Sequence, residues 1–127
     1  MATAQILTLP QRVLRHDHAI FAAAVALQTA HLLDEALIET ADTGDGLAAL
    51  AISVVAVAVY GRLAVWARVL LALLFGLAGI VGGVAMHVVP AVENGPGGAD
   101  FSGFAHAGAG VVLLVLAAVL ALRPTAH

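Results

Sequence analysis

Four long apolar runs, separated by short polar segments, dominate this sequence. They cover residues 19–38, 47–62, 69–89 and 101–122. About 20 apolar residues in an α-helix are enough to cross the ~30 Å hydrocarbon core of a bilayer. The sequence therefore predicts an all-α fold, a four-helix transmembrane bundle with up-down-up-down topology, in which residues 1–127 form a single four-span membrane domain.

The overall composition agrees with a bilayer as the solvent and excludes several classes of protein. Hydrophobic residues make up 62% of the chain and charged residues 10%, whereas soluble domains carry about 25% charged residues. The absence of cysteine excludes disulfides and thiolate chemistry. A net charge of −3 without a basic cluster argues against nucleic acid as a partner.

The boundaries of the four runs are set by polar and helix-breaking residues. The first run carries Gln28 and His31 near its middle, so it is a retained helix and not a secretory signal. The second run, 47–62, is short for a membrane span. Pro90 is expected to end the third helix, because proline disfavours helical continuation at the residue before it.

Orientation follows from the arginines, because short cytoplasmic loops retain basic residues. In a four-span arrangement every arginine falls on one side, while the two opposite loops carry acidic residues. The arginines are Arg12, Arg15, Arg62, Arg68 and Arg123, and the acids of the opposite loops are Asp42, Asp45, Glu93 and Asp100. Both termini are therefore predicted to be cytoplasmic (N-in/C-in) in the cell membrane.

Polar side chains within the apolar helices mark the candidate functional site. Gln28, His31 and Glu35 are spaced to form one stripe of the first helix, and Asp34 is adjacent to that stripe. Ionisable residues inside membrane helices are costly and are by default read as functional. This stripe is the first part of the predicted site.

The third and fourth helices carry one histidine each on a face rich in glycine. Small residues mark the sides on which membrane helices approach each other closely, so His87 and His106 are expected to point into the bundle. Counted from the helix midpoints at ~1.5 Å per residue, His31, Glu35, His87 and His106 all lie ~4–12 Å from the midplane toward the outer face. They are predicted to form one layer.

Such a layer has the chemistry of a metal site. Imidazole and carboxylate groups are ligands for Zn²⁺ and for non-haem iron. His31, His87 and His106 are the predicted ligands. Either Glu35 or Asp34 is a fourth ligand or the catalytic general base that activates a metal-bound water. Glu35 is the preferred base, because it lies one turn from His31 on the same stripe, and Asp34 would then orient an imidazole at the edge of the site.

The segment His31-Leu32-Leu33-Asp34-Glu35 resembles the HXXEE-motif family of small bacterial multi-span membrane proteins, which also carry later histidines. Asp34 stands where that family has its first glutamate. The resemblance implies a multi-pass protein of the bacterial inner membrane with a histidine and carboxylate cluster, and it implies no particular reaction.

Three functions fit these residues. The first is a membrane-embedded metalloenzyme that acts on a hydrophobic small molecule. The second is a haem b electron-transfer protein, with His87 and His106 as axial cofactor ligands. The third is a non-catalytic subunit or small carrier, in which the polar layer fixes the register of the helices or binds a partner. The expected partners are the lipid bilayer, the hydrophobic substrate, and a second copy or another subunit of a membrane complex.

Overall fold

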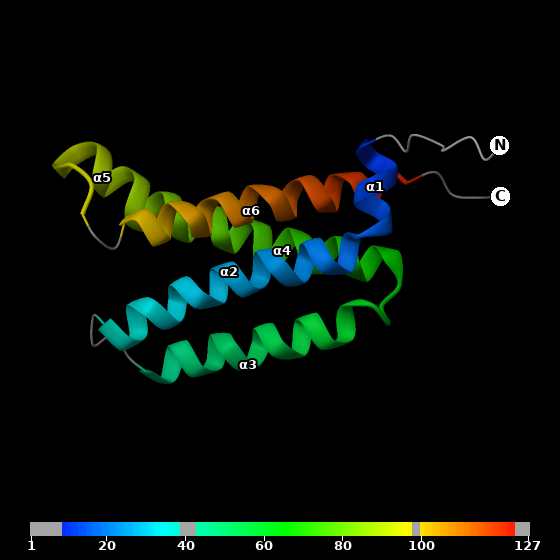
Figure 1. Ribbon diagram of the computed structural model, residues 1–127, viewed down its shortest axis with the longest axis horizontal. Coiled ribbons are helices and arrows are strands. Elements are labelled where there is room, and N and C mark those ends of the chain that lie inside the picture. Colours follow the sequence, from blue (N-terminus) through cyan, green and yellow to red (C-terminus); the bar gives the residue numbers. More distant parts are fainter. Residues whose placement is uncertain (1–8, 39–42, 98–99, 124–127) are drawn as a thin grey trace, which may run out of the picture.

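The computed structural model describes residues 9–38, 43–97 and 100–123, and the elements within this part of the chain are helical. The four long helices of this part of the chain lie side by side and alternate in direction (Figure 1). They are α2 (Asp17–Ile38), α3 (Thr43–Tyr60), α4 (Val65–Gly83) and α6 (Asp100–Ala121). A short helix that was not expected, α1 (Leu9–Arg15), crosses one end of the bundle and contacts α6 and α2.

Within the described residues, three helical segments are long and apolar enough to cross a membrane. These are Asp17–Leu37, Val65–Asn94 and Asp100–Ala121. The remaining long helix, α3, begins earlier and ends earlier than the expected 47–62, and its 18 residues extend about 27 Å at 1.5 Å per residue. A fourth span through α3 stays a prediction.

Pro90 does not end the third helix, in contrast to the expectation. α4 passes into a π-helical turn, η1 (Val84–Val88), and then into α5 (Val89–Asn94), so that one helical segment continues to Asn94. The N–H of Val89 donates to the carbonyl of Val84, five residues earlier. Proline is tolerated in the first turn of a helix, because the N–H that it lacks has no required partner there. Pro90 lies in the first turn of α5, which begins at Val89, so the helical path continues past the proline.

Glycine brings the backbones of α4 and α6 into direct contact. A Cβ atom on Gly110 would lie 2.8 Å from the carbonyl oxygen of Gly76 and 2.8 Å from the amide nitrogen of Ile80. A Cβ on Gly83 would lie 2.8 Å from the amide nitrogen of Ala107. Small residues at these positions let the helices pack at short range, a kind of packing that is common between membrane helices.

The apolar core lies in the half of the bundle that is nearer to α1. Phe21 stacks on Tyr60 with ring centroids 4.1 Å apart, and Phe75 meets Phe21 edge-on at 5.7 Å. Leu113 and Leu116, which lie on α6 after His106, are buried against this cluster. The other half of the bundle is left for the polar side chains.

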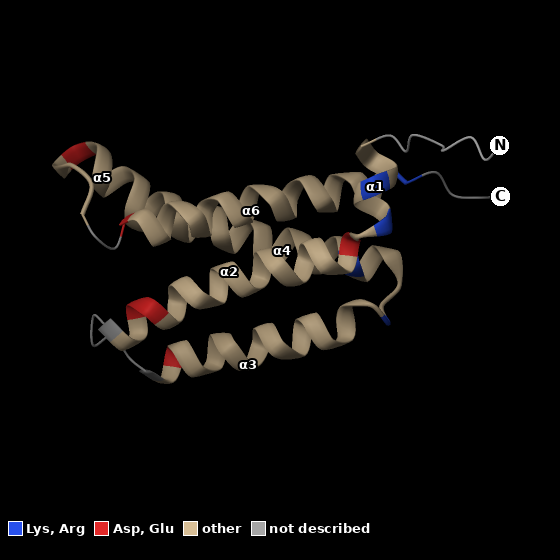
Figure 2. Cartoon of the chain, in the orientation of Figure 1, with Lys and Arg blue, Asp and Glu red and all other residues tan. Residues whose placement is uncertain are grey.

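Charges are segregated between the two ends of the bundle, as Figure 2 shows. The arginine end comprises α1, the turn between α3 and α4, and the end of α6. Its one described acid, Asp17, pairs with Arg68 at 3.0 Å, and Arg68 also donates to the carbonyls of Gly61 and Leu63. Asp42 lies outside the described residues. The segregation is the feature from which the N-in/C-in orientation was predicted.

Candidate metal centre

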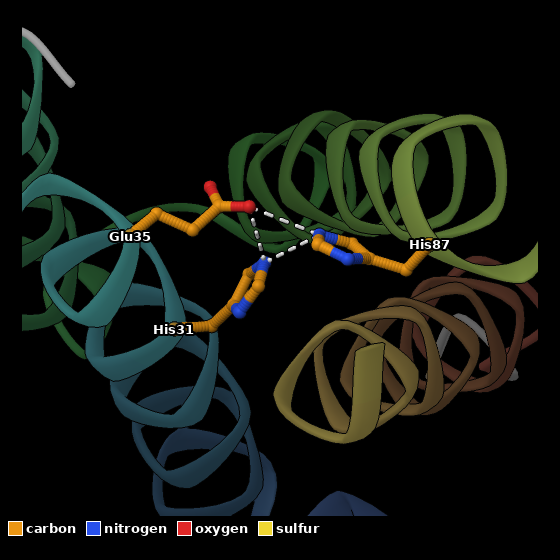
Figure 3. A group of neighbouring side chains, drawn as sticks. All are labelled: His31, Glu35 and His87. Carbon is orange, nitrogen blue, oxygen red and sulfur yellow. Dashed lines mark hydrogen bonds and ion pairs between the residues drawn. The ribbon is translucent and has the colours of Figure 1, made fainter. Parts of the chain in front are cut away.

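Three predicted site residues converge at the end of the bundle opposite the arginines. His31 and Glu35 lie one turn apart on α2, and His87 projects from η1 toward them (Figure 3). His31 and His87 are each only 5% exposed. Glu35 has a side chain that is 28% exposed, so it lies at the rim while both imidazoles are buried.

The three ligand atoms form a nearly equilateral triangle. Nε2 of His31 lies 3.1 Å from Nε2 of His87, and Oε1 of Glu35 lies 3.0 Å from the latter and 3.5 Å from the former. Ligand atoms that each lie ~2.0–2.1 Å from a tetrahedral zinc ion are about 3.3–3.4 Å apart. The triangle thus has nearly the dimensions of one face of a tetrahedral metal site.

The other ring nitrogen of each histidine has its own partner on α6. Nδ1 of His31 lies 2.9 Å from Oγ of Ser102, and Nδ1 of His87 lies 3.4 Å from Oδ1 of Asp100. Asp100 is itself held, because its Oδ2 accepts the N–H of Gly97 at 2.6 Å. Metal-binding histidines are commonly oriented in this way by a carboxylate or another acceptor.

These partners determine where the imidazole lone pairs point. An ionised carboxylate only accepts hydrogen bonds, so Asp100 holds the proton of a neutral His87 on Nδ1 and leaves a lone pair on Nε2. That lone pair faces Nε2 of His31 and the carboxylate oxygen of Glu35. These three atoms can be joined either by the proton of an imidazole, as the hydrogen bond between the two Nε2 atoms indicates, or by a metal ion.

The π-helical turn and a glycine together place the His87 ring. His87 is the fourth of the five residues of η1, and a Cβ atom on Gly103 of α6 would overlap the imidazole of His87. The ring thus fills the space above Gly103. Neither the π turn nor this contact was expected from the sequence.

His106 is buried near the triangle without being part of it. Its ring centroid lies 4.8 Å from that of His31, but the group whose ligand atoms lie within 4.8 Å of one another consists of His31, Glu35 and His87. Among the described residues, Nδ1 of His106 has no hydrogen-bond partner. The structure therefore places this predicted ligand beside the candidate metal centre.

The two acids that follow one another on α2 have different surroundings. Asp34 is exposed, and no hydrogen bond or ion pair joins it to the triangle within the described chain. The orienting role that the sequence suggested for Asp34 is filled by Asp100, with Ser102 as the partner of the second imidazole. From the sequence, Asp100 was predicted only as a charge of the outer loop. Its position immediately before the apolar run 101–122 is the signal that could have placed it at the start of α6.

The geometry does not favour a haem between His87 and His106. The glycine faces that would admit a porphyrin are filled, because Gly103 receives the His87 ring and a Cβ on Gly79 would overlap the side-chain amide of Gln28. Gln28 in turn donates to the carbonyl of Phe75 at 3.1 Å. A porphyrin would have to displace these contacts.

No family model, curated protein or solved structure matches this chain. The resemblance to the HXXEE-motif family thus stays a prediction.

Proposed function

We propose that this chain is a small integral membrane protein that binds one zinc or non-haem iron ion in the outer half of the bilayer, through His31, His87 and Glu35. The observation that carries the proposal is the triangle of two buried imidazole nitrogens and one carboxylate oxygen with edges of 3.0–3.5 Å. The histidine and carboxylate donors suit both metals.

A metal ion at this position would also connect two helical segments that otherwise have few contacts. α2 and α4 share few contacts compared with α4 and α6, and the triangle joins α2 to η1, which continues α4. A shared ion would hold these two segments together. Binding of the ion to the folded chain would stabilise this arrangement, so the ion and the fold would stabilise each other.

Three protein ligands leave a fourth tetrahedral position open, as in catalytic zinc sites. An ion with an open position supplies Lewis-acid chemistry, and we propose a hydrophobic small molecule in the bilayer as its substrate. Glu35 acts here as a ligand. Asp100, the nearest other acid of the site, stays engaged with His87 and Gly97 and fixes the imidazole.

The test combines metal analysis with a spectroscopic probe of the open position. Protein purified in detergent is expected to contain about one zinc or iron per chain and no Soret band. After replacement of the native ion by Co²⁺, the visible bands of tetrahedral cobalt are expected to shift when azide is added, because azide can occupy the open position.

Three other results of these measurements would each contradict part of the proposal. A Soret band would replace it by the haem alternative, and protein without metal would replace it by a carrier or subunit with a hydrogen-bonded histidine cluster. Cobalt bands that do not shift when azide is added would show that the site has no open position and is structural.

The orientation can be tested separately, because the native chain has no cysteine. With N-in/C-in topology, an Asn94→Cys variant is expected to react with a membrane-impermeant maleimide in intact cells. An Arg62→Cys variant should react only after permeabilisation, and both positions are exposed on the protein. The reverse labelling pattern would overturn the proposed orientation.

A further inference from the structure

A small hollow lies at the arginine end of the bundle, far along α2 from the candidate metal centre. It has a volume of about 350 Å³ and is lined by Arg15, His16, His18, Ala19 and Ala22. Arg15 and His16 are exposed between α1 and α2. The hollow thus combines a guanidinium and an imidazole with the apolar start of a long helix.

A longer apolar groove of about 540 Å³ runs between α2 and α3. Its lining residues are Ala22, Val25, Ala26, Thr29, Leu33, Leu50, Ser53, Val54, Val57 and Ala58. Thr29 and Ser53 are its two polar side chains, and their hydroxyl oxygens lie 2.7 Å apart in a hydrogen bond. The groove therefore offers an apolar surface without unpaired polar groups from these two residues.

The hollow and the groove are adjacent and lie along the same face of α2. Both are lined by Ala22, and their α2 residues recur every three or four positions from 18 to 33, the spacing of a single helix face. His18 lies at the junction, with Nε2 3.0 Å from the carbonyl oxygen of Val57 on α3. A ligand with a polar head and an apolar tail could lie across both.

The charge of the hollow favours an anionic head. Arg15 and His16 supply donors, while the neighbouring Asp17 carboxylate is neutralised by its 3.0 Å ion pair with Arg68. Guanidinium groups bind phosphate through charge-assisted hydrogen bonds. The hollow therefore suits a phosphate group better than a neutral or cationic one.

The length of the groove is close to half the thickness of the hydrocarbon core of a membrane, which is enough for most of one acyl chain. From Ala22 to Leu33, α2 rises about 16 Å at 1.5 Å per residue, and half of a ~30 Å hydrocarbon core is ~15 Å. We propose that one anionic phospholipid binds here, with its phosphate at Arg15 and His16 and one acyl chain between α2 and α3. The proposal depends on the membrane placement of the chain and is independent of the metal centre.

Native mass spectrometry of the full chain in detergent can test this proposal with dioleoyl phosphatidylglycerol and dioleoyl phosphatidylcholine as probes. We expect one phosphatidylglycerol per chain at concentrations where phosphatidylcholine does not bind, because the choline cation neutralises the phosphate of the latter lipid. Arg15→Gln should weaken its binding about fivefold, the equivalent of ~1 kcal/mol for one arginine near an anionic lipid. The control Arg123→Gln removes another exposed arginine and should have no effect.

The groove is tested by a substitution that fills it. Ala26→Phe should weaken binding of the dioleoyl lipid, whereas Ala118→Phe, at an exposed position on α6, should not. The proposal is overturned if both arginine variants weaken binding equally, if both lipids bind equally, or if Ala26→Phe has no effect. Displacement of the lipid by millimolar inorganic phosphate would instead show a site for a free anion. The metal content of these variants is expected to stay unchanged, so a failure of the lipid proposal can be distinguished from a failure of the metal proposal.

Discussion

Replacement of His87 by alanine is expected to reduce the metal content from about one ion per chain to background. Nε2 of His87 lies 3.1 Å from Nε2 of His31 and 3.0 Å from Oε1 of Glu35, so the substitution removes one corner of the triangle. Loss of a group that only orients a ligand typically costs 10–100-fold in metal affinity. Loss of a ligand should therefore cost more than ~100-fold.

The same measurement distinguishes a ligand from a base at Glu35. If Glu35 binds the ion, Glu35→Gln should lose metal together with His87→Ala, because the neutral amide is a poorer ligand than a carboxylate. If Glu35 is only a general base, the variant should keep its metal and lose turnover. The 3.0 Å and 3.5 Å distances of Oε1 from the two imidazoles favour the first outcome.

Elemental analysis after gel filtration provides the readout, with a matched histidine as the control. His16 is exposed and lies at the arginine end, so His16→Ala should leave the metal content unchanged. Asp100→Asn should give an intermediate result, because Asp100 contacts Nδ1 of His87 and not the ion. Metal retained in His87→Ala, or lost equally in His16→Ala, would contradict the assignment of the site.

The sequence allowed the main parts of this structure to be predicted because helical periodicity is a local property. The i, i+4 spacing of His31 and Glu35 already places both on one face of a helix. The depth of each polar residue follows from its distance to the ends of an apolar run. Such local rules were enough to predict the helical class and the segregation of the arginines. They also predicted that His31 and His87 lie close together.

The parts that could not be predicted depend on contacts between helices. The π turn at Val84–Val88 rotates His87 relative to a regular α-helix. No short sequence motif predicts such a turn. The partnership of Asp100 with His87 requires the register of α6 against η1. The same register leaves His106 beside the triangle, although its depth along α6 agrees with that of the other histidines.

Because that register is set where α4 and α6 touch, the glycines of this interface should control both stability and the metal centre. Gly110 lies against the backbone of α4, and neither the carbonyl of Gly76 nor the amide of Ile80 can move aside without moving the helix. Gly108, on the same helix, is exposed, and a Cβ atom there would meet nothing within 4 Å. The two positions form a matched pair for the same substitution.

Gly110→Ala is accordingly expected to destabilise the protein by about 1–3 kcal/mol or more, the usual cost of overpacking. Its new Cβ would lie 2.8 Å from two backbone atoms of α4, so the helices would have to separate and carry Asp100 away from His87. Gly108→Ala should leave stability unchanged or raise it slightly, because alanine favours the helix over glycine by ~1 kcal/mol. Thermal unfolding in detergent, followed by circular dichroism and by metal release, measures both effects. Equal melting temperatures for the two variants would show that backbone contact between α4 and α6 does not set the register of the site.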